Sequence, residues 1–324
     1  MNLEYEDFMS VLGIDLGGTK VAIAMFSESG ELLKKETAAL DHRTGSSVAE
    51  LICDVLKGFL EIEAKDPVRA VGVSVPGISR SKSGTVWAPN IKGWEDYPLL
   101  KELQALCGTI PVSIDSDRAC YILGELWQGN ARGCKDAIYL SVGTGIGAGI
   151  LINGNILRGS QDIAGCIGWM ALDRPFKEKY TSCGCFEYHA SGEGIAKVAR
   201  ELLASMPEYS GELRDGDPGN ITAADVFNAY EKRDRLAVEV MKQCVEFWGM
   251  AVANLISLFN PEKIIFGGGV FGPGVQFISD IQQEANKWAQ PISATQVSME
   301  ESGAGGNAGV IGAAYLALQS VKNI

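Results

Sequence analysis

The chain has 324 residues, of which 46% are hydrophobic, and carries a formal net charge of −12. This length and apolar content suit two globular domains with their own cores, and the negative charge argues against nucleic acid as a partner. No apolar run reaches the ~18 residues of a membrane span, and the acidic start, MNLEYEDFMS, lacks the basic and apolar regions of a signal peptide. The eight cysteines have no framework spacing, so we expect reduced thiols in a cytoplasmic protein.

Residues 11–26, VLGIDLGGTKVAIAMF, predict two apolar strands joined by a glycine turn. Between the strands stand Asp15, Gly17, Gly18, Thr19 and Lys20. The glycines let backbone N–H groups approach an anion, and the acid can hold a hydrated Mg²⁺ beside phosphates. A plain hairpin turn is the alternative, because Gly-Gly pairs are common there, but the order of residues favours a phosphate site. Neither the Walker A spacing nor a Rossmann helix follows the glycines.

The next segment alternates strands with a helix, as in an α/β layer. We expect a third strand over residues 31–38, a helix over 46–64 and a strand over 68–75 that runs into Pro76-Gly77. The loop 88–94, APNIKGW, is rich in turn formers. Its Asn90 and Trp94 either line a polar pocket or pack the loop, and the sequence leaves both open.

A strand is expected over residues 110–114 and a helix over 118–127, with Asp115, Ser116 and Asp117 between them. The helix dipole favours an ionised carboxylate at that junction. Helix capping is the stronger explanation from position alone, since Asp and Ser are preferred caps. One residue can also cap a helix and accept a substrate proton.

Residues 137–159 repeat the opening design. An apolar strand meets the turn Gly143-Thr144-Gly145, a second strand follows, and Asn153-Gly154 predicts another hairpin. Two similar halves indicate a duplicated fold with a nucleotide between them.

The segment 163–192 contains a pattern that suggests zinc. Cys183-Gly-Cys185 is half of a zinc site, but no second Cys pair accompanies it, and only Cys166 and His189 are local candidates to complete it. Free thiols are therefore the preferred interpretation.

Later glycine turns complete the pattern. A helix is expected from Thr222 and another over 235–258, then a strand over 262–269 that ends in Gly267-Gly268-Gly269. Such a glycine run lets a flat ligand lie against the backbone. Residues 303–317 predict a further glycine turn leading into a helix of small residues.

In this order, the motifs resemble those of the ROK family of sugar kinases and repressors, within the actin-like ATPase superfamily. The resemblance covers about residues 11–318. It rests on DLGGTK (15–20), VPG (75–77), APNIKGW (88–94), SDRACYILGE (116–125), VGTGIGAGILING (142–154), AGCIGW (164–169), CGCFEYHASG (183–192), FGGGV (266–270) and the final GNAGVIGAA run after 305.

The resemblance implies two similar ribonuclease H-like α/β domains with a nucleotide and sugar cleft between them. Their expected bounds are 1–115 with 308–324, and 116–307. The implied cofactors are ATP and Mg²⁺, the implied catalytic base is Asp117, and the implied assembly is a homodimer. The implied cofactor-binding residues are Asp15 for Mg²⁺ through water, Gly17, Gly18, Thr19 and Lys20 for phosphates, Gly143, Thr144 and Gly145 for phosphates, and Gly268 and Gly269 for adenosine. The implied sugar-binding positions are Gly77, Asn90, Ser116, Asp117, Cys166, Trp169 and Glu187.

The departures from the family pattern concern the sugar and the metal. Family kinases carry Asn before the catalytic Asp, where Ser116 stands here. They carry Glu and His, for sugar and structural zinc, where Cys166 and Trp169 stand. We therefore expect no structural zinc, and an ATP-dependent kinase for a hexose-like monosaccharide with an altered pocket. The alternatives are a sugar sensor with weak turnover and a repressor. The second is disfavoured by the charge and by the ten residues before Val11, where repressors carry a helix-turn-helix.

Overall fold

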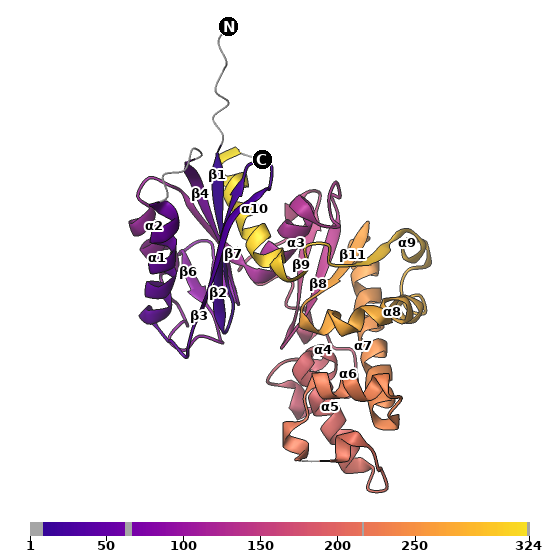
Figure 1. The fold of residues 1–324 in the computed structure, drawn as a ribbon. Coiled ribbons are helices and arrows are strands. Elements are labelled where there is room, and N and C mark those ends of the chain that lie inside the picture. The colour runs from indigo at the N-terminus through magenta and orange to yellow at the C-terminus, as the bar shows by residue number, and fades with distance from the viewer. Residues whose placement is uncertain (1–8, 62–66, 216, 323–324) are drawn as a thin grey trace. The chain divides into compact units, whose positions relative to one another are not determined.

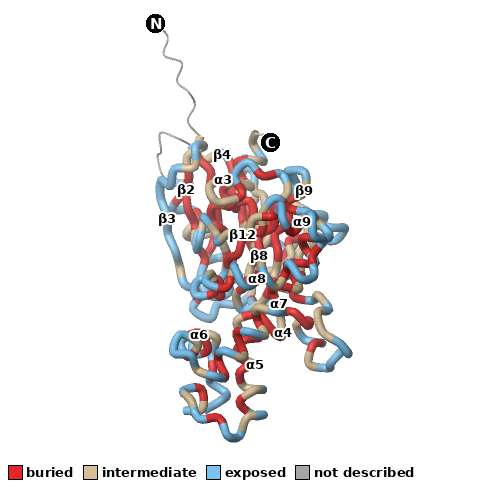
Figure 2. The backbone as a smooth tube through the Cα atoms, turned by 90° about the vertical axis from the view of Figure 1, so that its right-hand side faces the viewer, coloured by how far each residue is buried: buried red, intermediate tan, exposed pale blue. Residues whose placement is uncertain are grey.

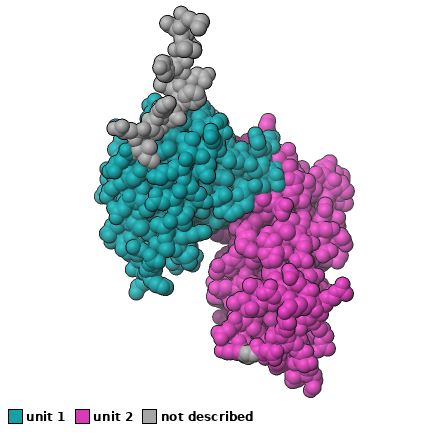
Figure 3. Space-filling model, viewed as in Figure 1, with its two compact units in different colours: residues 1–133, 156–164, 303–324 teal, residues 134–155, 165–302 magenta. Residues whose placement is uncertain are grey.

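The computed structural model describes residues 9–61, 67–215 and 217–322 (Figure 1). The chain folds into two compact units, which have different colours in Figure 3. Unit 1 comprises residues 1–133, 156–164 and 303–324, and unit 2 comprises 134–155 and 165–302. Each unit is built around one five-stranded sheet.

Unit 1 has a mixed sheet in the order β3-β2-β1-β4-β7. β2 pairs antiparallel with β1 and β3, whereas β1, β4 and β7 run parallel. Its elements are β1 (Ser10–Leu16), β2 (Lys20–Ser27), β3 (Leu32–Ala39), α1 (Ser46–Leu60), β4 (Val68–Val75), β5 (Ile78–Arg80), β6 (Thr85–Trp87), α2 (Leu99–Cys107), β7 (Val112–Ser116), α3 (Asp117–Gln128) and α10 (Ala308–Lys322).

Unit 2 repeats that arrangement with the sheet order β10-β9-β8-β11-β12. β8 pairs antiparallel with β9 and parallel with β11, which is parallel to β12. The shared order confirms the duplicated fold that the two glycine turns predicted. Its elements are β8 (Ala137–Val142), β9 (Ile146–Ile152), β10 (Asn155–Ile156), α4 (Cys185–Ala190), α5 (Gly192–Ser205), α6 (Ala223–Glu231), α7 (Arg235–Phe259), β11 (Lys263–Gly267), α8 (Ile278–Ala285), α9 (Pro291–Gln296) and β12 (Ser298–Glu301), with short 3-10 helices η1 (Ile167–Trp169), η2 (Glu178–Tyr180) and η5 (Gly269–Phe271) among them.

Helices cover both faces of the unit 1 sheet. Alternate strand residues such as Leu12 and Val73 pack with apolar residues of α1 and α2, while Val11, Ala24 and Ala70 pack against α10. The central strands β1, β2 and β4 therefore lie mostly in the buried interior, whereas the edge strand β3 is exposed (Figure 2). Both faces of β1 and β4 are apolar because both are covered.

Backbone-to-backbone contacts made possible by glycine join α10 to its neighbours. A Cβ at Gly72 of β4 would lie 1.8 Å from the carbonyl oxygen of Ala313. One at Gly312 would lie 1.7 Å from that of Cys120, and one at Gly124 would lie 2.4 Å from that of Ala308. We call this set, together with Gly13, the glycine seam. Because the seam joins α3 to α10, α3 belongs to unit 1, and the boundary falls after Gly133. It thus differs from the break after residue 115 expected from the sequence.

A separate short segment of the chain also belongs to unit 1. Residues 156–164 join it through an ion pair between Arg158 and Asp115, with an Nη2–Oδ2 distance of 2.7 Å. The carboxylate of Asp162 accepts hydrogen bonds from the backbone N–H and hydroxyl of Ser81 at 3.0 and 2.9 Å. The sequence expectation had placed this segment in the second domain.

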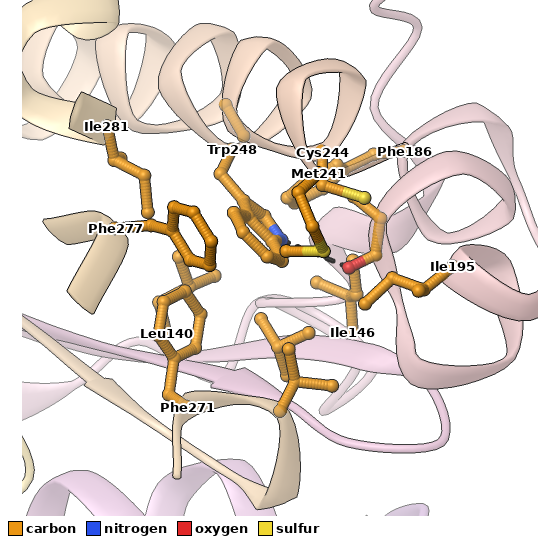
Figure 4. Packing of buried hydrophobic residues seen from close by; sticks show 14 of the residues in the cluster. Leu140, Ile146, Phe186, Ile195, Met241, Cys244, Trp248, Phe271, Phe277 and Ile281 are labelled. Atoms are coloured by element: carbon orange, nitrogen blue, oxygen red, sulfur yellow. Dashed lines mark hydrogen bonds between the residues drawn. The ribbon is translucent and has the colours of Figure 1, made fainter. Parts of the chain in front are cut away.

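The core of unit 2 gathers around α7 (Figure 4). The fully buried indole of Trp248 lies 5.1 Å from the ring of Phe271 and 6.5 Å from that of Phe277, measured between centroids. Its Nε1 donates to the carbonyl oxygen of Ala190 at 3.0 Å, which fixes the end of α4 against α7.

Most predicted elements agree with the structure to within a few residues. The helix expected over 46–64 ends at Leu60, and residues 62–66 lie outside the described part of the chain. Asn153 and Gly154 both have positive φ, as a hairpin turn of the predicted type requires. Among the described residues, no helix combines the length and apolar character needed to cross a bilayer.

Candidate functional site

The first glycine turn connects β1 to β2 at the edge of unit 1. The Gly17 N–H donates to the Lys20 carbonyl at 2.9 Å, which closes the turn. Gly18, Thr19 and Lys20 are exposed, so a ligand can reach this turn. Neither glycine has a positive φ. The two glycines are therefore useful here because they lack side chains and let a ligand approach the backbone, not because they allow a left-handed conformation.

Asp15 lies at the end of β1, beneath that turn. In the sheet register it is opposite Ser74 of β4, which is opposite Asp115 of β7, so the three side chains point to one face. A Cβ at Gly309 of α10 would lie 2.5 Å from the Asp15 carboxyl carbon, so the helix backbone packs directly on this acid. Burial raises the pKa of Asp15, although the nearby Ser74 hydroxyl and the charges of Lys20 and Lys35 lower it.

Asp117 is the first residue of α3 and follows β7 directly. The helix cap is Ser116, whose hydroxyl accepts from the Ala119 N–H at 3.4 Å, so capping does not occupy Asp117. Within the described chain, the Asp117 carboxylate accepts local bonds from backbone N–H groups, that of Arg118 at 2.8 Å among them. Burial raises the pKa of Asp117 to about 6, with Arg118 lowering it and Asp15 raising it through their charges. A carboxyl group with these properties is suited to accept a proton near neutral pH.

Asp115 has a partner that no sequence pattern indicated. This buried carboxylate accepts from Nε of Arg158 at 2.9 Å as well as from Nη2, and its other oxygen accepts from the Ser116 N–H at 2.8 Å. The pair holds the strand end that presents Asp117. No local pattern identifies a partner 43 residues away.

The loop 88–94 separates its two candidate residues. Asn90 is exposed and lines a pocket of about 460 Å³ with Gly18, Thr19 and Lys92. Trp94 is fully buried, stacks on Tyr97 at 4.5 Å and donates from Nε1 to the Gly45 carbonyl at 2.9 Å. The sequence left the two alternatives open, and each applies to one residue: Asn90 faces a pocket and Trp94 packs the loop.

The glycine at position 77 is required by backbone conformation and close packing. Its φ is +151°, and a Cβ there would lie 2.1 Å from the carbonyl oxygen of Trp87. The residue therefore brings the end of β4 into contact with the small β5–β6 hairpin.

The second glycine turn, in unit 2, lies at the start of a helix. The Gly143 N–H donates to the Gly145 carbonyl at 2.9 Å, and the Gly143 carbonyl accepts from the N–H of Gly192, the first residue of α5, at 2.8 Å. Thr144 is exposed. The amino terminus of a helix favours anions, so this turn and α5 together form a suitable place for phosphate.

A pocket of about 730 Å³ adjoins this turn in unit 2. It is lined by Gly143, Thr144 and Gly269, with α5 and α6 residues that include Lys197, Arg200 and Phe227. Gly268 has φ +86°, and its Cβ would lie 2.4 Å from the Val142 carbonyl oxygen. A Cβ at Gly269 would meet nothing within 4 Å, so this glycine leaves open space for a ligand.

Glu187 of α4 lies between the second glycine turn and η1. Its Oε2 accepts from the Ile146 N–H at 2.7 Å, and added Cβ atoms at Gly145 and Gly168 would lie 2.7 and 2.9 Å from the same oxygen. Burial raises the pKa of Glu187. The remaining carboxylate oxygen has no hydrogen bond within the described chain.

Cys166 and Trp169 stand at the two ends of η1, whose Gly168 packs against the Glu187 side chain. Cys166 is the residue before η1 and is half-buried, whereas the Trp169 side chain is 59% exposed. A Cβ at Gly184 would lie 2.6 Å from the Trp169 Cα, so the turn packs closely on the start of α4. All eight cysteines are free thiols. Among the described residues, no three His, Cys, Asp or Glu side chains converge as metal ligands.

The predicted site residues thus divide between the two units. Unit 1 holds Asp15, Gly17, Gly18, Thr19, Lys20, Gly77, Asn90, Ser116 and Asp117. Unit 2 holds Gly143, Thr144, Gly145, Cys166, Trp169, Glu187, Gly268 and Gly269.

Comparison with known proteins gives one family. The family model described as ROK family matches residues 11–320. A glucokinase from Halalkalibacterium halodurans is 34% identical over 97% of this chain and 96% of its own length. A xylose repressor from Caldicellulosiruptor bescii is 32% identical over 87% of this chain and 71% of its own. The crystal structure of a ROK family glucokinase from Streptomyces griseus, in complex with glucose and AMPPNP, covers 96% of this chain and 99% of its own with a TM-score of 0.76 and 29% identity. These similarities confirm the actin-like fold class that the motifs predicted.

Proposed function

The chain belongs to the ROK family, and we propose that it is an ATP-dependent kinase that phosphorylates a hydroxyl of a hexose-like sugar. The observation that supports this best is the carboxyl group of Asp117, which is half-buried, is not used as the helix cap and lies at a strand–helix junction. With a pKa of about 6 it is ionised at neutral pH and can accept the hydroxyl proton as the phosphoryl group is transferred.

The nucleotide side of the proposal rests on the residues around the two glycine turns. The unit 2 pocket of about 730 Å³ is roomy enough for a nucleoside and ends at the Gly143 turn and the start of α5. Gly268 and Gly269 would lie by the adenosine, and Thr144 and Gly145 by the phosphates. In unit 1, the turn from Gly17 to Lys20, exposed from Gly18 on, offers further phosphate donors.

Asp15 would hold Mg²⁺ through water. Its carboxylate is pressed between strand and helix backbone, which fixes its position, and the charge of a bound cation would stabilise its ionised form. When bound, ATP supplies the phosphoryl group and Mg²⁺ neutralises its charge. The protein's own contribution is position and electrostatic complementarity.

The proposed sugar-binding residues include some that match the family pattern and some that depart from it. Glu187 keeps one carboxylate oxygen free of hydrogen bonds from the described residues, and Asn90 and Ser116 offer polar groups in unit 1. Cys166 and Trp169 replace the Glu and His of the glucokinase pattern. The indole has no acceptor and the thiol accepts only weakly, so we infer a sugar other than glucose.

A sugar sensor with weak turnover is the second candidate, and the same two replacements favour it. A coupled assay for ADP release, run with thermal-shift measurements over a panel of monosaccharides, separates the two. Sugar-dependent ADP release supports the kinase. A thermal shift with a sugar but no ADP release with any sugar would instead establish the sensor. The homodimer implied by the family remains a prediction for light scattering.

We expect kcat/KM for the sugar to fall tenfold per pH unit below about pH 6, because protonated Asp117 cannot accept a proton. Activity is lost on the acid side because the pKa of Asp117 is raised, so its carboxyl takes up a proton at a higher pH than an ordinary aspartate does. Since the charge of Arg118 lowers this pKa, Arg118→Gln should move the midpoint to higher pH. An acid limb with its midpoint near pH 4 in the unaltered protein would contradict the assignment.

We also expect poor activity on glucose, with kcat/KM below the ~10⁴ M⁻¹s⁻¹ that ordinary enzymes reach. Hydrogen bonds to a charged group are worth ~1.5–3 kcal/mol, so loss of the carboxylate at position 166 should weaken glucose binding roughly tenfold to a hundredfold. The double variant Cys166→Glu with Trp169→His should regain that factor in kcat/KM.

Trp288→His is the matched control, because Trp288 is a similarly exposed tryptophan of unit 2, 64% against 59%. It should leave glucose kinetics unchanged. Glucose turned over by the unaltered protein faster than every other sugar tried would refute the altered pocket.

A further inference from the structure

A chain of three buried or half-buried side chains anchors α4 to the loop before it. The Tyr180 hydroxyl of η2 lies 2.9 Å from Oδ2 of Asp173 and 2.9 Å from Nε2 of His189. The same Asp173 oxygen accepts from Nζ of Lys177 at 2.7 Å. The imidazole stacks on Phe247 of α7, with centroids 4.2 Å apart and 9° between the planes. We call Asp173, Tyr180 and His189 the tyrosine anchor.

The chemistry of the three groups fixes the direction of each hydrogen bond. Lys177, Tyr180 and the Arg174 N–H lower the pKa of Asp173 to about 2, so its carboxylate only accepts. The single Tyr180 proton therefore goes to Asp173, and the phenol oxygen accepts from His189. Burial lowers the pKa of His189 to about 4, so the ring is neutral with its proton on Nε2. Nδ1 is then a lone-pair acceptor, buried without a hydrogen-bond partner among the residues that the structure describes.

The residue before His189 has its own anchor. The Tyr188 hydroxyl donates to Glu201 of α5, and Nζ of Lys179 lies 2.7 Å from Oε2 of that same carboxylate. The Lys179 ammonium also lies 4.4 Å from the centroid of the Tyr188 ring. Both residues that follow Glu187 are thus tied to η2 or α5. On a helix of six residues, that leaves Glu187 little freedom to turn.

The structural zinc of the family would hold the same part of the chain, α4 and the loop before it. The residues present here do not fit a zinc site. Position 169 is a tryptophan without a ligand atom. The Cys183 Sγ lies 3.8 Å from the Gly184 carbonyl oxygen, and within the described ranges no metal-binding group of three is formed.

We propose that the tyrosine anchor holds α4 without a metal and so positions Glu187 toward the sugar. This rests on the proposed sugar-binding role of Glu187. Tyr180 and His189 are positioning residues, because they act through α4 and do not touch the substrate.

The test compares two tyrosine-to-phenylalanine changes in unit 2. Tyr180→Phe removes both bonds of the anchor. Tyr209→Phe is the matched control, since the Tyr209 hydroxyl also donates to an aspartate, Asp234, at 2.6 Å and accepts a bond from the Leu213 N–H at 3.4 Å. We expect Tyr180→Phe to raise the KM for the sugar roughly tenfold, the size of one weakened hydrogen bond to a carboxylate. It should leave kcat within about twofold and the KM for ATP unchanged. The control should change none of these.

A second readout does not depend on turnover. The chain has two histidines, so ¹⁵N spectra of the imidazoles, assigned with His42→Gln, can report His189 alone. We expect a neutral ring protonated on Nε2 at pH 6, and a changed Nε2 signal in Tyr180→Phe.

Three results would overturn the anchor. The first is a sugar KM that is equal in Tyr180→Phe and the unaltered protein. The second is a His189 ring protonated on Nδ1. The third is one zinc per chain in protein purified without added metal, lost on changing Cys183 and Cys185 to serine. Failure of the kinase proposal would look different: no sugar would release ADP, while the spectra still showed the anchored ring.

Discussion

Asp117→Asn should abolish most phosphoryl transfer, by ~10²–10⁴-fold in kcat, while the fold and ATP binding persist. The amide has nearly the shape of the carboxylate but cannot take the hydroxyl proton. It can still accept the 2.8 Å bond from the Arg118 N–H, so α3 keeps its start. Steady-state kinetics on the sugar that the panel identifies, with ATP affinity from calorimetry and far-ultraviolet circular dichroism, give the measurement.

The matched control for this change is Asp54→Asn on α1. Asp54 is an exposed acid of the same unit, paired at 3.1 Å with Lys57, and its neutralisation should leave turnover within error. If Asp117→Asn kept near-normal turnover, another group would have to be the base, and Asp117 would then be a structural residue of the junction.

Gly312→Ala should destabilise unit 1 by about 3 kcal/mol or more, the upper end of what overpacking costs. The new methyl carbon would lie 1.7 Å from the Cys120 carbonyl oxygen and 2.5 Å from its carbon. Backbone cannot rotate away as a side chain can, so α10 or α3 must move as a whole. Thermal and urea unfolding followed by circular dichroism measure the loss.

The same substitution elsewhere in the unit should have the opposite sign. Gly58 of α1 is exposed, and a Cβ there would meet nothing within 4 Å. Gly58→Ala should therefore stabilise the protein by ~0.4–1 kcal/mol through helix propensity and a less flexible unfolded chain. Equal effects at positions 58 and 312 would show that the seam is looser than the contacts indicate.

The parts of the fold that the sequence predicted are those set by local pattern. Apolar runs bounded by glycine located β1, β2, β8 and β9, and the repeated turn predicted the duplication that the two sheet orders confirm. The junction of β7 and α3 was likewise readable, because a strand, polar residues and a helical pattern follow one another there.

The parts that local pattern could not predict depend on partners distant in sequence. Arg158 meets Asp115 across 43 residues, and α3 joins unit 1 only because Gly124 and Gly312 admit close backbone contact. The tyrosine anchor likewise needs Phe247 from a distant helix to cover His189. Periodicity identifies which face of an element is apolar, but not which element covers it.

The glycine seam also bears on the order in which the chain acquires structure during synthesis. One face of the unit 1 sheet, including Val11, Ala24, Phe26 and Ala70, is covered by α10. The helix that covers it is made after all of unit 2. Until residues 308–322 leave the ribosome, that sheet face lacks its main cover and keeps only contacts such as that of Trp127 with Phe26, and its exposed apolar surface is the kind that chaperones bind. Most of unit 2 lies in one continuous stretch, residues 165–302. This stretch is therefore synthesised in full before α10, the last helix of unit 1, is available to cover the unit 1 sheet.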